Sequence, residues 1–312
     1  MIVFQESENK MKYFKVQADR RAQRYHIDKK TFDEITERKR PFEQRNINGK
    51  ISQYAICPSC LNPIQLIGLS HEIRVSPHGK HTGKDINGLP EWKQRKYEYC
   101  PFARHNEYIP PNDDDLLEEI DQSVIDLYDI LKEQFDKVVY VVQKELHIRC
   151  SERFWTDALQ AYLVNRVYLY PWLSEANLPY IFAYRGMQHM RCFGQQFEEG
   201  SEIYNALSNL QSVRLERLNE NSGYFVLRNE NGHFINLIFR FTNHCQNAVE
   251  GESLNESMMF YIDNADTGQV VYEQRISFSE TFFTNIINSE NATRYRNMNL
   301  LGIAEELMQP LS

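Results

Sequence analysis

The chain has 312 residues, and its 35 Lys and Arg residues against 43 Asp and Glu residues give a formal net charge of −8. A hydrophobic content of 42%, with 18 Phe, 18 Tyr and 3 Trp, supplies enough apolar surface for a folded core and excludes a mainly disordered chain. No apolar run approaches the ~18 residues of a membrane helix, and acidic residues replace the apolar segment of a signal peptide, so we expect a cytoplasmic protein.

The charge is divided unevenly along the chain. Residues 1–110 carry 20 basic and 13 acidic side chains, whereas residues 111–312 carry 15 basic and 30 acidic ones. We expect two domains: a basic N-terminal region, 1–110, containing a metal module over 51–110, and an acidic domain, 111–312. The basic region favours contact with a polyanion, although opposite charges would also help the two parts to dock.

The hydrophobic patterning predicts an α+β fold: a small knuckle-type module, a helical middle and an antiparallel meander of about five strands with C-terminal helices. In chain order, we expect a short helix that begins after an N-cap at Thr31, strand-like runs on both sides of the sequence CPSC, and helices over 113–208. Alternating β-rich runs separated by turn sequences follow over 212–278, and two helices end the chain.

Cysteine and histidine spacing predicts one metal site. Cys57 and Cys60 form a Cys-x2-Cys knuckle, 20 residues separate Cys60 from His81, and 18 more separate His81 from Cys100. A knuckle aims two thiolates at one point, and zinc needs a second pair of ligands to complete a tetrahedron. Cys100 is the expected third ligand, on a turn after an extended KYEY segment.

The fourth ligand is expected to be His81, with His78 as the alternative. His81 is preferred because Gly79 and Gly83 would leave it on a flexible turn that folds over the knuckle. Four protein ligands would make the zinc structural. A redox role for the cysteine pair is the competing interpretation, but a thioredoxin-like site needs a βαβ setting, which does not follow here.

The pattern PSC…SPHGKH, from Cys57 to His81, resembles the N-terminal zinc region of the CoiA-like competence protein family. In that family a CPxC knuckle precedes a PHFAH-type stretch and then a nuclease-like domain. The resemblance implies metal ligation by Cys57, Cys60 and one histidine of the His78/His81 pair, and it implies a role in bacterial DNA handling. It does not extend to Cys100 or to a nuclease domain.

The strand-rich region contains candidate catalytic residues of a metal-dependent nuclease. Asp263 is followed, after nine residues, by Glu273-Gln274-Arg275, which matches the order of a PD-(D/E)XK site, where magnesium lies between carboxylates. Arg275 would be a poor substitute for the lysine that orients water, because a guanidinium keeps its proton. The same residues also form an ordinary hairpin, in which Asp263 and Asp266 are turn residues.

Cations and aromatic residues alternate around the predicted metal site, as they do in proteins that bind unpaired nucleic acid. The candidate contacts are Lys80, Lys84, Trp92, Lys93, Arg95 and Lys96. The aromatic residues would equally serve as the core of a small module.

Three functions remain open from the sequence. The favoured one is a zinc-binding protein that contacts nucleic acid in bacterial DNA handling or defence. The first alternative is a divergent magnesium-dependent nuclease, and the second is a zinc-stabilised protein whose acidic domain binds a protein partner.

Overall fold

The structure is a computed structural model that describes residues 11–19, 22–45, 49–69, 76–98, 100, 102–103, 116–230, 234–248, 254–279, 281–289 and 292–311. It divides into an N-terminal unit, Met1–Ser123 with Gln246–Asn255, and a C-terminal unit, Val124–Cys245 with Glu256–Ser312. The predicted boundary between residues 110 and 111 lies outside the described residues. The described helices include none with the length and apolar character needed to cross a lipid bilayer.

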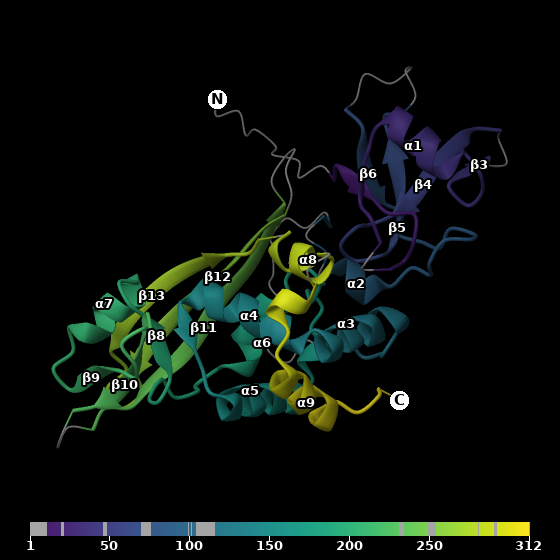
Figure 1. Cartoon of the computed structure of the whole chain (residues 1–312). Helices are drawn as coiled ribbons and strands as arrows, with labels where there is room; N and C mark the ends of the chain where they lie inside the picture. Colours follow the sequence, from purple (N-terminus) through teal and green to yellow (C-terminus); the bar gives the residue numbers. More distant parts are fainter. Residues whose placement is uncertain are drawn as a thin grey trace, which may run out of the picture. The chain divides into compact units, whose positions relative to one another are not determined.

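The N-terminal unit is built on a four-stranded antiparallel sheet in the order β3-β4-β5-β6 (Figure 1). Its elements are β1 (Tyr13–Phe14), β2 (Tyr25–His26), α1 (Lys29–Thr36), β3 (Glu43–Arg45), β4 (Ile51–Ile56), β5 (Pro63–Ile67), β6 (His78–His81) and α2 (Gln94–Glu98). Helix α1 begins earlier than expected, because the Asp28 side chain accepts a hydrogen bond from the Thr31 amide at 2.9 Å and is therefore the N-cap in place of Thr31. Phe32 of this helix packs against Phe14 in the core.

The C-terminal unit contains most of the helices. These are α3 (Gln122–Glu133, which begins at the unit boundary), α4 (Phe135–Leu146), α5 (Glu152–Val164), η1 (Val167–Leu169), α6 (Leu178–Gly186), α7 (Glu202–Ser208), α8 (Phe282–Ile287), η2 (Ala292–Tyr295) and α9 (Met298–Leu307). Helix α6 is almost wholly buried, since Phe182 contacts Phe135 of α4 and both Trp155 and Tyr162 of α5.

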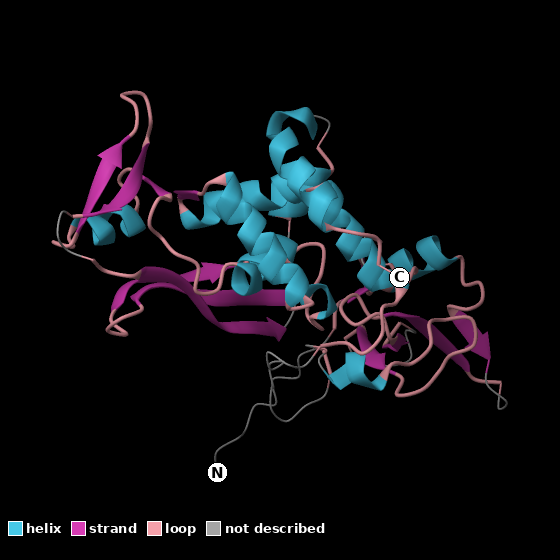
Figure 2. Ribbon diagram, turned by 90° about the horizontal axis from the view of Figure 1, so that it is seen from below, coloured by secondary structure: helices cyan, strands magenta, loops and turns pink. Residues whose placement is uncertain are grey.

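Two antiparallel sheets accompany these helices, and the α+β class is thereby confirmed. The first has the order β7-β8-β10-β9 and the second β11-β12-β13. Their bounds are β7 (Ile148–Arg149), β8 (Gln196–Glu198), β9 (Val213–Arg217), β10 (Tyr224–Asn229), β11 (Leu237–Ala248), β12 (Leu254–Asn264) and β13 (Val270–Ser277). Helices cover one face of the second sheet (Figure 2), where Phe154 of α5 meets Phe239 of β11.

The expectation of one five-stranded meander over 212–278 is wrong, because the segment from His189 to Glu198 separates β10 from β11. The first part of this segment bonds β11, where Phe239 donates to the Met190 carbonyl and Cys192 donates to the Leu237 carbonyl, both at 2.9 Å. The second part, β8, pairs with β10. The backbone groups that would join β10 to β11 are therefore already bonded elsewhere.

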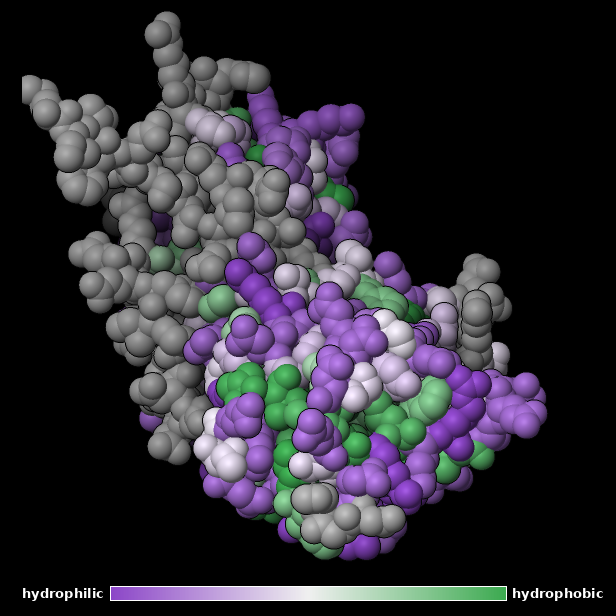
Figure 3. Space-filling model, turned by 90° about the vertical axis from the view of Figure 1, so that its left-hand side faces the viewer, coloured by the Kyte–Doolittle hydropathy of each residue, from purple (hydrophilic) through white to green (hydrophobic). Residues whose placement is uncertain are grey.

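Several large apolar side chains of the C-terminal unit are exposed among the residues that the structure describes. In the view of Figure 3, hydrophobic residues are interspersed with hydrophilic ones. The most exposed large apolar residues of this unit are Phe234, Val164, Met298, Leu218 and Val270. They come from separate loops and element ends, so their exposure by itself does not define an interface.

Two helical glycines of this unit are expected to respond oppositely to substitution by alanine. A Cβ atom at Gly186 would lie 2.9 Å from the Ala158 carbonyl oxygen of α5, whereas a Cβ atom at Gly302 in α9 would meet no atom within 4 Å. We expect Gly186→Ala to lower the free energy of unfolding by about 1–3 kcal/mol. Gly302→Ala should raise it by about 1 kcal/mol, because alanine favours the helix. Denaturant unfolding followed by fluorescence measures both, and equal effects would contradict the close approach of α5 and α6.

Candidate metal centre

The Cys57–Cys60 knuckle is the loop of the β4–β5 hairpin. The Cys57 amide donates to the Asn62 carbonyl at 2.9 Å and the Leu61 amide donates to the Cys57 carbonyl at 3.2 Å, which closes a tight turn. Leu61 takes a left-handed backbone conformation with φ of 60° to complete it. Because both cysteines belong to this one turn, their sulfur atoms lie at the same end of the hairpin.

His81 reaches the knuckle from β6, where it pairs with Ile64 of β5. Its Nε2 atom lies 3.2 Å from the Cys60 sulfur and 3.6 Å from the Cys100 sulfur. His78 is three residues earlier on the same strand, and alternation along a strand directs the two side chains to opposite faces. The His78 ring instead contacts the Ser76 carbonyl at 2.8 Å.

The flexible turn expected around His81 is wrong, since His81 ends a paired strand. Gly79 lies inside β6, and its amide donates to the Met11 carbonyl at 2.9 Å. A Cβ atom at Gly79 would lie 2.8 Å from the Met11 sulfur. The glycine therefore permits close packing of the chain rather than movement of the histidine.

Cys100 follows helix α2, and its amide donates to the Tyr97 carbonyl at 3.0 Å. The segment before Cys100 is thus helical and not extended as predicted. Asn62 connects this segment to the knuckle: its side chain accepts from the Lys93 amide at 2.7 Å and donates to the Lys93 carbonyl at 2.9 Å. Asn62 is only 1% exposed, so these two bonds form in a site with little competing water.

Cys57, Cys60, His81 and Cys100 lie close together and could hold a metal ion. One ligand atom from each residue lies within 4.8 Å of all the others. The three cysteines are 0%, 7% and 3% exposed, and the Cys57 and Cys100 sulfurs are 3.7 Å apart. Three thiolates with one imidazole form a donor set typical of tetrahedral zinc.

The electrostatics of this cluster favour a cation. Burial on its own would lower the pKa of His81, but the charges of Cys57 and Cys60 and the hydrogen bonds with them together outweigh burial and raise that pKa to about 11. Burial raises the pKa of the Cys100 thiol well above its ordinary value, and the hydrogen bonds with Cys57 and Cys60 raise it further. Burial opposes ionisation of Cys57 too, yet hydrogen bonds from Cys100 and Cys60 and the charge of His81 bring its pKa well below its ordinary value. Without a metal, the imidazolium is the cation that offsets a thiolate here.

The aromatic residues around the centre hold His81 in place. The Tyr97 ring lies edge-on to the His81 ring at 5.1 Å between centroids, and Trp92 does the same at 6.1 Å. Trp92 also packs against Tyr97 at 5.1 Å. Trp92, predicted as a nucleic-acid contact, therefore packs around the candidate ligand.

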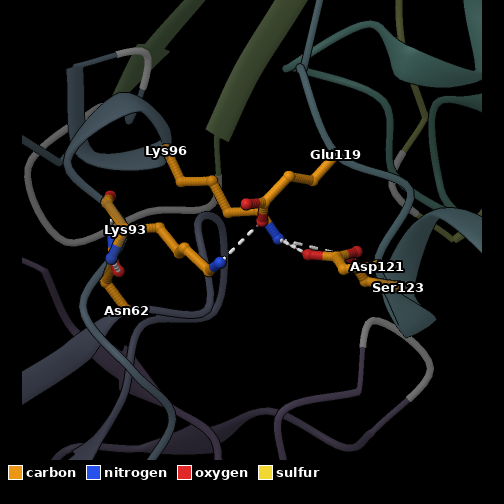
Figure 4. Close-up of polar contacts among 6 residues, drawn as sticks. All are labelled: Asn62, Lys93, Lys96, Glu119, Asp121 and Ser123. Carbon is orange, nitrogen blue, oxygen red and sulfur yellow. Dashed lines mark hydrogen bonds and ion pairs between the residues drawn. The ribbon is translucent and has the colours of Figure 1, made fainter.

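Two of the predicted nucleic-acid contacts are paired within the N-terminal unit. Lys93 donates to the Glu119 carboxylate at 2.7 Å, and Lys96 bonds both Asp121 and Ser123 (Figure 4). Lys80 and Lys84 are exposed. The fold brings Arg95 into α2, but its side chain lies outside the described part of the structure.

The predicted catalytic residues are spread along a plain β-hairpin. Asp263 of β12 is held by Arg240 of β11 in a two-point ion pair, and that guanidinium also lies 4.0 Å above the Tyr261 ring. Glu273 is exposed opposite Tyr261, and the Arg275 side chain bonds the Ser257 hydroxyl at 3.1 Å. Among the described residues, the group that could hold a metal is the Cys/His cluster, so this hairpin lends the nuclease hypothesis no geometric support.

Sequence reasoning missed a buried polar network in the C-terminal unit. The His244 ring bonds the Tyr170 hydroxyl at 2.9 Å and the Glu256 carboxylate at 2.7 Å, and Asn177 donates to the same carboxylate oxygen. His244 is 3% exposed and Phe278 stacks on its ring. The sequence pattern of β11 gave no signal for this network, because strict alternation would place His244 on the face of Arg240 and Thr242, opposite the buried Phe239 and Phe241. The left-handed backbone of Asn243, with φ of 54°, interrupts that alternation just before His244.

Comparisons with known proteins found no match: no protein-family model, no curated protein and no solved structure matches the chain.

The two histidines of β6 are expected to differ in their effect on metal binding. His81→Ala removes a donor atom and should weaken Co²⁺ binding more than about 10-fold, whereas His78→Ala should leave it unchanged. Titration with Co²⁺, followed by its visible absorption, measures both variants. Equal losses in the two variants would contradict the assignment of His81.

Proposed function

We propose that the N-terminal unit is a zinc-binding module in which Cys57, Cys60, His81 and Cys100 hold one structural zinc ion. The observation that carries this proposal is the convergence of four donor atoms within 4.8 Å at a buried point. The protein supplies all four tetrahedral positions, so the ion would stabilise the fold without activating water.

Zinc fits this donor set better than a redox role for the cysteines. A dithiol couple needs two sulfurs, whereas here a third cysteine and an imidazole lie at the same point. Two of the donors come from one hairpin loop, and the other two come from β6 and from the segment that follows α2. An ion at this point would join three chain segments, as structural zinc does in small modules.

Elemental analysis of the purified chain tests the proposal. We expect one zinc per chain in the wild type and less than about one tenth of that in Cys57→Ser, since three remaining ligands bind the ion weakly. Cys245→Ser is the matched control, because Cys245 lies in β11 and outside the cluster. Equal zinc in both variants, or iron in place of zinc, would overturn the assignment.

Contact with nucleic acid is a second candidate function of the N-terminal unit. Its support is the exposed position of Lys80, next to His81 on β6, and of Lys84 in the turn that follows, in the part of the chain with the basic excess. Lysines at such positions bind phosphates without reading base sequence.

Lys80→Glu with Lys84→Glu is expected to weaken binding of a single-stranded oligonucleotide at least 10-fold and to lower the salt dependence of that binding, because two phosphate contacts are lost. The control is Arg153→Glu, an exposed cation of α5 in the C-terminal unit. Fluorescence anisotropy at several salt concentrations measures both. Unchanged affinity in the double variant, or no binding by the wild type, would exclude this function.

A further inference from the structure

A second candidate site lies in the C-terminal unit, where a cavity of about 180 Å³ opens between α4, β7, β10 and the start of α9. Its walls combine aromatic, cationic and amide side chains. They are formed by Asp136, Tyr140, Gln143, Lys144, Arg149, Tyr224, Tyr295, Asn297 and Leu300.

Aromatic rings form much of the cavity wall. The Tyr140 and Tyr295 rings pack together with centroids 4.6 Å apart. The Tyr224 ring carries the Arg149 guanidinium over its face at 3.9 Å. Rings arranged in this way offer faces on which a planar ligand ring can stack.

The cavity concentrates positive charge within an acidic unit. The C-terminal unit has 22 acidic and 15 basic residues, yet Lys144 and Arg149 both line the cavity. Among the described residues, the Lys144 ammonium and the Gln143 side-chain amide have no hydrogen-bond partner. A guanidinium stacked on a ring keeps its N–H groups directed outward, where they can bind oxygens of an anion.

The single carboxylate of the cavity wall is neutralised and rigid. Asp136 is 2% exposed and accepts hydrogen bonds from Arg296 at 3.3 Å, from the Asn297 amide at 2.9 Å and from the Lys137 amide at 2.9 Å. Asn297 in turn caps α9 by accepting from the Leu300 amide. These bonds fix the start of α9 against α4, so the wall is formed before any ligand arrives.

We propose that this cavity binds a mononucleotide, with the base against the tyrosines and the phosphate on Lys144 and Arg149. The cavity volume is slightly larger than the roughly 150 Å³ of an engineered cavity that binds benzene, so it suits one planar ring. The phosphate then lies toward the cations at the open side, and two charge-assisted contacts fix it.

Isothermal titration of the full chain with AMP, CMP, adenosine and inorganic phosphate tests this proposal. We expect AMP or CMP to bind at least 10-fold more tightly than either adenosine or phosphate. Lys144→Glu should weaken nucleotide binding at least 10-fold, because it places a carboxylate next to the phosphate. Tyr295→Leu should weaken nucleotide binding with a smaller effect on phosphate.

Arg191→Glu is the control, since Arg191 is exposed in the same unit and does not line the cavity. It should bind nucleotide as the wild type does. The proposal is overturned if neither nucleotide binds, if phosphate binds as tightly as AMP, or if Lys144→Glu and Arg191→Glu behave alike. Lys144 is exposed, so its variant should fold, and an unchanged thermal midpoint verifies this.

Discussion

Three cysteine sulfurs and one imidazole nitrogen converge where water has almost no access, and the architecture of the N-terminal unit depends on this convergence. A buried thiolate is unstable unless a cation lies next to it, because the surroundings cannot solvate its charge. Three parts of the N-terminal unit bring these groups together. The β4–β5 hairpin supplies two sulfurs, β6 supplies the imidazole, and Asn62 holds the segment that leads to Cys100.

The grouping of Cys57, Cys60, His81 and Cys100 could be predicted from the sequence, because the Cys-x2-Cys spacing indicates a site that needs two further donors. The Cys-x2-Cys spacing fixes two donors within one turn, and the two-residue period of a strand separates His78 from His81 once β6 is recognised. The expectation that glycines place His81 on a flexible turn was nevertheless wrong. Gly79 packs against Met11, and the sequence does not reveal a contact between segments so far apart. Most helices of the C-terminal unit and the strands over 212–278 were predictable from their periodicity. The short strands β7 and β8, of two and three residues, lie inside the region predicted as helical.

Two further errors concern contacts between residues far apart in sequence. Lys93 and Lys96 looked available for phosphate, but Glu119 and Asp121, about 25 residues later, neutralise them. The five predicted strands form two sheets because the segment from His189 to Glu198 bonds to both β10 and β11. Periodicity predicts a strand but not its partner, and side-chain type predicts charge but not its neutralisation.

The order of the four ligands along the chain has a consequence for how the N-terminal unit folds. Cys57 and Cys60 belong to one hairpin loop, whereas His81 and Cys100 each lie about 20 residues further along. An ion captured first by the knuckle would close two successive loops as His81 and then Cys100 bind. Each closure removes conformational entropy from the unfolded chain, as a disulfide of similar span does, by about 3 kcal/mol in the chain-entropy model. The metal would thus act as a reversible cross-link, and the supply of zinc would govern how much of the newly made chain reaches its folded form.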